Sequence, residues 1–202
     1  EYMIGSSTVG IIFLQNNNSL DPNIGNWTNK EQMVAANDII AAVNWWANQD
    51  PKAKLTYTYD IHYNVPNIYN NGISELSYKG AMDYLGYNKY TNPTDNVYDY
   101  LNTIRTQNKT DWAFVIFVLK NKGPTSISSS ASRGGPYITL WYNVYFSNKD
   151  TDITNAVRHE IGHTFYATDE YTWQWGDYSK KYSGYLNQSN TIAHSFGGQG
   201  KI

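Results

Sequence analysis

Runs of apolar residues along the chain predict strands, two of which lack a polar face. Residues 8–15 are apolar and β-branched, and residues 112–120 contain the nearly continuous run AFVIFVL. Such runs are typical of central parallel strands that are covered on both faces. Residues 54–63 alternate between apolar and polar side chains, and residues 137–142 are a further candidate strand. The apolar face of the alternating segment carries Leu55, Tyr57, Tyr59 and Ile61.

Helical periodicity occupies much of the sequence between these strands. Thr28 and Glu31 have the spacing of a capping box, and the helix that follows them should stop near residues 50–51, which are Asp and Pro. Residues 73–85 and 96–106 are predicted helices. A last helix is predicted over about residues 152–167, with an acidic residue favouring its N-terminus. The core-facing stripe of this last helix carries Ile153, Val157, Ile161 and Phe165.

Segments rich in Gly, Pro, Ser and Asn separate the predicted elements. Residues 91–95, which include Pro93, separate the two middle helices. Residues 123–135 are too rich in Ser, Gly and Pro to form the centre of a sheet. Residues 126–135 have two interpretations: a loop without regular structure, or the upper rim of a binding cleft, where an extended peptide adds to a strand edge through main-chain hydrogen bonds.

Composition narrows the classes of protein to consider. A chain of 202 residues suits one domain with a sizeable core. The net charge of −2 and the 16% of charged residues exclude a basic nucleic-acid footprint and a polybasic membrane patch. The absence of cysteine excludes disulfides and thiolate zinc sites. The longest aliphatic run, residues 9–14, is too short to span a bilayer. The polar, weakly charged composition predicts a secreted or cell-surface protein, which we expect to be a monomer.

The last predicted helix carries the pattern H-E-x-x-H in His159, Glu160 and His163. Positions four apart share one face of a helix, so the two imidazoles can bind one metal ion, and neutral imidazole is a good zinc ligand. Zinc lowers the pKa of a bound water to roughly 7, and a neighbouring carboxylate such as Glu160 can accept its proton. Chance predicts only ~0.002 such motifs in a chain of this composition. The alternative is a surface helix with two incidental histidines.

The sequence after the motif supplies a candidate third ligand. Asp169 lies six residues beyond His163, which is the spacing of the third ligand in the longer pattern H-E-x-x-H-x-x-G-x-x-H. Glu170 is a competitor, although it also suits an acceptor that orients a ligand histidine. His194 is a third candidate, with an exposed tail histidine as its alternative role. We interpret His62, on the polar face of its predicted strand, as a solvated residue and not a ligand.

Residues 159–171 resemble the metzincin branch of the zincin peptidases, with Asp in place of the third His. Snapalysins, in that branch, also use Asp there. The run H-E-x-G-H-x-F-x-A-x-D-E-Y is also similar to the igalysin (immunoglobulin A peptidase) family. Two departures stand out: Tyr166 occupies the position of the turn-making Gly, and no Met follows Met82, so we expect Leu186 to replace the methionine under the metal. Because Tyr adopts positive φ at a cost, we expect the turn to be built differently or spread over residues 166–168.

The resemblance implies an α+β fold with α/β-like character: a twisted mixed sheet with an antiparallel edge strand, a backing helix and an active-site helix. The order of the predicted elements agrees with it. Residues 1–168 would form an upper subdomain, with the active helix at about 152–167, and residues 169–202 a small irregular lower subdomain of the same single domain. For the oxyanion of the tetrahedral intermediate we assign Tyr185 as a donor, with Tyr182 as the alternative.

These inferences predict a zinc endopeptidase that uses Zn²⁺ as its cofactor. Its ligands would be His159, His163 and Asp169, and Glu160 would be the general base acting on a protein or peptide substrate. Two rivals remain. One is a non-catalytic binding module that kept the fold, which the intact Glu160 disfavours because a structural zinc site fills all four positions with protein ligands. The other is a zinc amidase acting on cell-wall or glycoconjugate amides.

Overall fold

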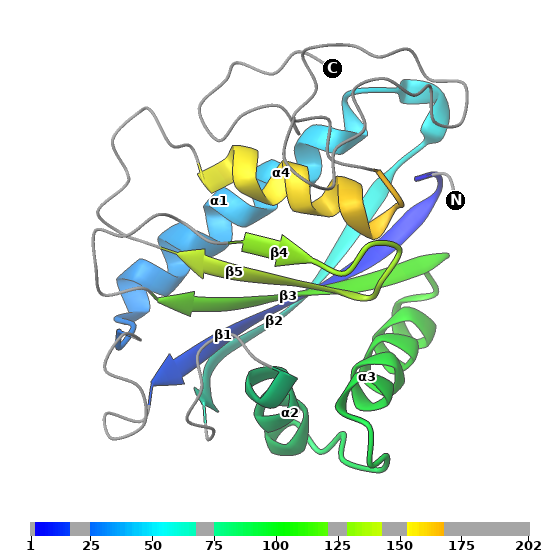
Figure 1. Cartoon of the computed structure of the whole chain (residues 1–202). Coiled ribbons are helices and arrows are strands. Elements are labelled where there is room, and N and C mark those ends of the chain that lie inside the picture. The colour runs from blue at the N-terminus through cyan, green and yellow to red at the C-terminus, as the bar shows by residue number, and fades with distance from the viewer. Residues whose placement is uncertain (1–2, 17–24, 68–74, 121–128, 143–152, 168–202) are drawn as a thin grey trace, which may run out of the picture.

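A computed structural model describes residues 3–16, 25–67, 75–120, 129–142 and 153–167. Within these residues the chain forms one five-stranded sheet and four α-helices (Figure 1). The strands are β1 (Ser6–Asn16), β2 (Thr56–Asn67), β3 (Trp112–Lys120), β4 (Ser129–Ala131) and β5 (Tyr137–Tyr142). The helices are α1 (Asn29–Ala47), α2 (Glu75–Tyr84), α3 (Pro93–Asn108) and α4 (Ile153–Thr164), with a short 3₁₀ helix, η1 (Pro51–Ala53), after α1.

The sheet is mixed, with strand order β2-β1-β3-β5-β4. Strands β2, β1, β3 and β5 are parallel, and β4 pairs antiparallel with β5 at the edge. The segment 112–120 is the central strand, as its unbroken apolar run predicts. The mixed α+β class is confirmed, and the parallel core of the sheet gives it α/β-like character. The part of residues 123–135 that the structure describes contributes only the three-residue edge strand β4 and the turn after it.

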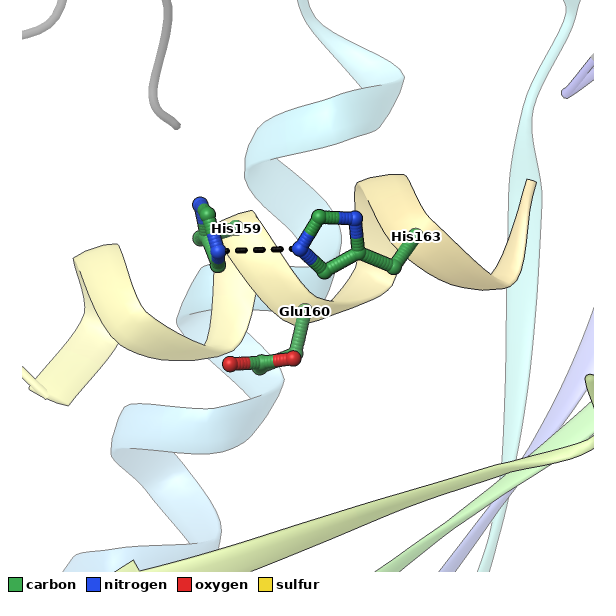
Figure 2. A group of neighbouring side chains, drawn as sticks. All are labelled: His159, Glu160 and His163. Atoms are coloured by element: carbon green, nitrogen blue, oxygen red, sulfur yellow. Dashed lines mark hydrogen bonds between the residues drawn. The ribbon is translucent and has the colours of Figure 1, made fainter. Parts of the chain in front are cut away.

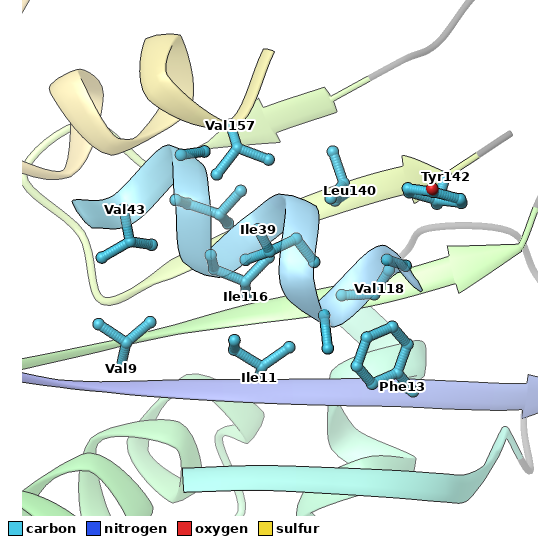
Figure 3. Close-up of a cluster of buried hydrophobic side chains, with 14 of the residues drawn as sticks. Val9, Ile11, Phe13, Ile39, Val43, Ile116, Val118, Leu140, Tyr142 and Val157 are labelled. Carbon is cyan, nitrogen blue, oxygen red and sulfur yellow. The ribbon is translucent and has the colours of Figure 1, made fainter. Parts of the chain in front are cut away.

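Helices cover both faces of the sheet, α1 and α4 on one side and α2 and α3 on the other (Figure 1). Alternate side chains of β1 and β3 enter two separate cores, which explains why these strands lack a polar face. The core under α1 and α4 is drawn in Figure 3. Its strand residues are Val9, Ile11, Phe13, Phe114, Ile116, Val118, Ile138, Leu140 and Tyr142. The core under α2 and α3 includes Ile12, Leu14, Val65, Val115, Phe117 and Leu119.

The start of α1 is fixed by the predicted capping box. The Thr28 side chain accepts a hydrogen bond from the N–H of Glu31, and the Glu31 carboxylate accepts one from the N–H of Thr28. That carboxylate also pairs with Lys120 at the end of β3, with a shortest N–O distance of 2.7 Å. Lys120 Nζ donates in addition to the carbonyl of Asn26 at 2.7 Å. The cap therefore joins the first turn of α1 to the central strand.

Several helix and strand boundaries differ from those predicted, and among them α4 ends at Thr164 and not at about residue 167. Pro93 does not separate two helices but begins α3, with Asn92 as the N-cap, because a proline at the first helical position lacks only an N–H that has no helical partner. Strand β2 runs on to Asn67, past Pro66, where a proline is tolerated because β2 lies at the sheet edge. A bulge that places Asn64 at φ 55° precedes this extension.

No helix in the described part of the chain is long and apolar enough to cross a membrane. The expected lower subdomain, residues 169–202, lies outside the described residues.

Candidate metal centre

Helix α4 is held in place by its apolar stripe. Val157 and Ile161 are fully buried against α1 and the sheet, and Phe165 packs edge-on against Phe114 of β3, with ring centroids 6.2 Å apart. The predicted stripe is confirmed at these three positions, whereas the side chain of Ile153 lies outside the described part. Because this stripe faces the core, the motif residues lie beside it on the same helix.

His159 and His163 project from one side of α4, one turn apart (Figure 2). Their Nε2 atoms are 3.0 Å apart, and the rings are almost perpendicular, with an interplanar angle of 86°. Both side chains are only partly buried. The i, i+4 spacing thus brings two potential ligand nitrogens together at a position that solvent can reach.

The imidazole of His163 is oriented by the chain just beyond the helix. Its Nδ1 lies 2.8 Å from the carbonyl oxygen of Ala167, which can only accept a hydrogen bond. Nδ1 therefore carries the proton in this arrangement, and the lone pair of the neutral ring is on Nε2, the atom that faces His159. Metal-ligating histidines commonly donate their other N–H to a carbonyl in this way.

Tyr166 makes the turn that returns Ala167 to the histidine. It has φ +70°, in the left-handed region, two residues after the helix ends at Thr164. The N–H of Tyr166 bonds to the His163 carbonyl and the N–H of Ala167 to the Gly162 carbonyl, each at 3.0 Å. These two bonds form a Schellman motif. The expectation that Tyr166 would avoid positive φ is wrong: it takes the same turn a glycine would.

Glu160 points from the next side of the helix toward the sheet (Figure 2). Its side chain is buried, with 3% exposed, and Ser129 of β4 donates a hydrogen bond to Oε1 at 2.8 Å. One carboxylate oxygen and one ring nitrogen from each histidine all lie within 4.8 Å of one another. Glu160 is thus close enough to act on a water between the three side chains.

This donor set fits a zinc ion. Two imidazole nitrogens bound to one tetrahedral zinc lie about 3.3 Å apart, since each Zn–N bond is about 2.0–2.1 Å. The observed distance between the two Nε2 atoms is 3.0 Å, so the imidazole rings would have to move apart only slightly to bind the ion. His159, Glu160 and His163 are the one cluster of three or more metal-ligating side chains found among the described residues. The other predicted site residues, Asp169, Glu170, Tyr182, Tyr185, Leu186 and His194, lie outside them.

His62 lies far from this centre in the topology, on the edge strand β2. Its Nε2 is 3.0 Å from Oδ2 of Asp60, and the Tyr100 hydroxyl donates to the same oxygen at 2.8 Å. The bond from His62 and, after it, the one from Tyr100 hold the pKa of Asp60 below its ordinary value, against the effect of burial. The side chain of His62 is 31% exposed, so it is a half-buried partner of Asp60 and not a fully solvated residue.

Three residues that contact the centre were not predicted from the sequence: Ser129, Gly134 and Ala167. Ser129 contacts Glu160 across 31 positions of the chain. The N–H of Gly134 donates to the His163 carbonyl at 2.8 Å. Both come from the segment 126–135, so its described part is an edge strand and turn attached to the motif helix. The only feature of the sequence that could have indicated these contacts was the glycine content of that segment.

Comparison with protein-family models, with curated proteins and with solved structures finds no match to this chain, so the case for its function depends on the motif and its geometry.

Proposed function

We propose that this protein is a zinc-dependent endopeptidase of metzincin-like fold. The observation that carries the proposal is the cluster on α4: two ring nitrogens 3.0 Å apart, with a buried carboxylate within 4.8 Å of both. A structural zinc site would surround the ion with four protein ligands. This helix instead offers two histidines and, within the same turn, a carboxylate close enough to act on a water between them, which favours catalysis.

Each motif residue has a distinct role in this proposal. His159 and His163 would hold the ion, and the imidazole of His163 is already oriented by its bond to the Ala167 carbonyl. The zinc supplies Lewis acidity, which activates water and polarises the peptide carbonyl. Glu160 accepts a proton from the water whose oxygen forms a new bond to the peptide carbonyl carbon. It later delivers that proton to the peptide nitrogen, so that the C–N bond breaks and the amine leaves.

The remaining parts of the proposal follow from the resemblance to metzincins. Asp169 would be the third ligand, and Tyr185 would donate a hydrogen bond to the oxyanion. The substrate would extend along β4, the antiparallel edge strand, which lies beside α4 (Figure 1). Main-chain hydrogen bonds at this edge would hold an extended peptide near Glu160, whose carboxylate already contacts β4 through Ser129.

The test is hydrolysis by the parent protein and by Glu160→Gln, which keeps the side chain's shape but cannot accept a proton. Zinc content should be unchanged, while cleavage of casein falls by about 10²–10⁴-fold. Asp95→Asn is a matched control, since it converts an exposed carboxylate of α3, on the other face of the sheet, to an amide. It should cleave casein like the parent.

A Glu160→Gln protein as active as the parent would rule out Glu160 as the base. The same assay on amide-containing glycans separates the peptidase from an amidase. Cleavage of glycan amides without cleavage of casein would contradict the endopeptidase proposal, and cleavage of neither by a zinc-loaded protein would favour a binding module.

A further inference from the structure

The ring of Tyr166 lies directly against the backbone of Gly134, in the turn between β4 and β5. A Cβ atom on Gly134 would come within 2.2 Å of Cζ and 2.3 Å of Cε1 of that ring. Gly134 also has φ +64°, a conformation that L side chains rarely adopt. The lack of space for a side chain and the backbone conformation therefore both require glycine at 134. The three atoms nearest to an added Cβ all belong to the ring of Tyr166.

The same two residues converge on the backbone of His163. Its carbonyl accepts one hydrogen bond from the N–H of Gly134 at 2.8 Å and another from the N–H of Tyr166 at 3.0 Å. One donor comes from the edge-strand turn and the other from the end of α4. The main chain of the histidine is thus fixed between two segments that are about 30 residues apart in sequence.

The conformation of Tyr166 extends this control to the imidazole. Positive φ is unfavourable for a tyrosine, and the contact of its ring with Gly134 acts together with the two hydrogen bonds of the turn to offset the backbone strain. The resulting turn places the Ala167 carbonyl 2.8 Å from His163 Nδ1. The ring of Tyr166, the turn at Tyr166 and the orientation of the His163 imidazole are therefore connected by a continuous series of contacts.

We infer that Tyr166 and Gly134 form a positioning pair for His163, which holds its Nε2 toward the metal through the Tyr166 turn. This inference rests on the proposed metal site. It explains a tyrosine where a glycine would make the turn at lower cost: the ring adds a contact with the β4–β5 turn that glycine cannot make. The pair thereby connects the edge strand to a metal ligand.

The first test is zinc affinity, measured by competition with a chelating dye. Tyr166→Gly keeps the left-handed turn accessible and removes only the ring. We expect its zinc affinity to fall by about 10-fold or more, the usual effect of losing a group that orients a ligand. Tyr166→Phe keeps the ring and should bind zinc like the parent. Equal affinity of Tyr166→Gly and the parent would overturn the inference.

The second test needs no metal and uses a double-mutant cycle in chemical denaturation. Gly134→Ala should lower the denaturation midpoint strongly in the parent and much less in Tyr166→Gly, because the ring that it meets is gone. Gly86→Ala is the matched control: Gly86 has φ +87° but no neighbouring atom within 4 Å of an added Cβ. Its effect should be the same in both backgrounds.

The two tests separate this inference from the proposed function. Additive effects of Gly134→Ala and Tyr166→Gly would show that the residues do not act as a pair. A parent that binds no zinc would overturn the proposed metal site and, with it, any role of the pair in metal binding. A parent that binds zinc tightly, with Tyr166→Gly equally tight, would overturn the positioning role alone.

Discussion

At the scale of single residues, the contact between Ser129 and Glu160 bears directly on the proposed catalytic role of Glu160. Burial of a carboxyl group that is only 3% exposed costs free energy unless the group is hydrogen-bonded. Ser129 donates to Oε1 at 2.8 Å from the edge strand. The bond fixes one oxygen of the proposed base, so that the other oxygen would be the one to accept a proton.

Ser129→Ala should therefore slow hydrolysis without removing the metal. A hydrogen bond to a charged group contributes about 1.5–3 kcal/mol, so a loss of about 10- to 100-fold in kcat is expected, with KM and zinc content little changed. Ser129→Thr retains the hydroxyl and should restore most of the rate. Equal kcat values for the Ala variant and the parent would show that Ser129 does not position the base.

The proposed third ligand is tested at a single residue as well. In a crystal structure of the zinc-loaded protein, an Asp169 carboxylate oxygen should lie at about 2.0–2.2 Å from the ion, with Glu170 directed away. Asp169→Ala should lose zinc affinity, and Glu170→Ala should retain it. Glu170 or His194 in that position, or unchanged affinity of Asp169→Ala, would refute this assignment.

At the scale of helices and strands, the elements with the clearest periodicity were predictable. Strand β3 and helix α4 follow from apolar patterns that depend only on nearby residues, and so does the cluster on α4, since i, i+4 spacing is local geometry. The start of α3 lies before the predicted one because Pro93 is the first helical residue and not a separator. The contacts of Ser129 and Gly134 with α4 could not be predicted, because tertiary packing alone brings β4 and its turn to that helix.

The junction between α1 and β3 gives a stability prediction at this scale. The pKa of Glu31 lies below its ordinary value: burial acts to raise it, but hydrogen bonds from Lys120 and Thr28 outweigh burial. Lys120→Met should lower the free energy of unfolding at pH 7 by about 1–3 kcal/mol, between the values for exposed and buried ion pairs. Lys79→Met, which removes the i, i+4 pair with Asp83, should cost less than about 1 kcal/mol.

The loss of stability caused by Lys120→Met should depend on pH, and the sign of this dependence follows from the lowered pKa of Glu31. A carboxyl group whose pKa is lowered on folding contributes stability above its unfolded pKa of about 4.3, and this is lost as pH falls through the folded value. The destabilisation by Lys120→Met should therefore be smaller at pH 3 than at pH 7 in urea denaturation. A difference that is constant or larger at pH 3 would show that Lys120 acts through packing and not through its charge.

At the scale of the whole molecule, the helix that carries the candidate metal centre packs on the core under α1 and α4. Helix α4 packs on α1 and on the sheet through Val157 and Ile161, and its end is attached to the β4–β5 turn through Gly134. Metal binding at this helix should therefore stabilise the fold as a unit. A ligand that binds only the native state adds about 2.7 kcal/mol at a free concentration of 100 times Kd.

Zinc at that concentration should raise the midpoint of thermal unfolding of the metal-free parent, and a chelator should reverse the shift. His163→Ala, measured beside it, should show little or no shift. An equal shift in both proteins would mean that zinc acts at some other place in the chain.

The most direct measurement of the central claim is the zinc content of the purified protein, determined by mass spectrometry of the metal. We expect near-equimolar zinc in the parent and its loss in the double variant His159→Ala/His163→Ala, with both proteins folded by circular dichroism. Full retention of zinc in a folded double variant would contradict the proposed metal site.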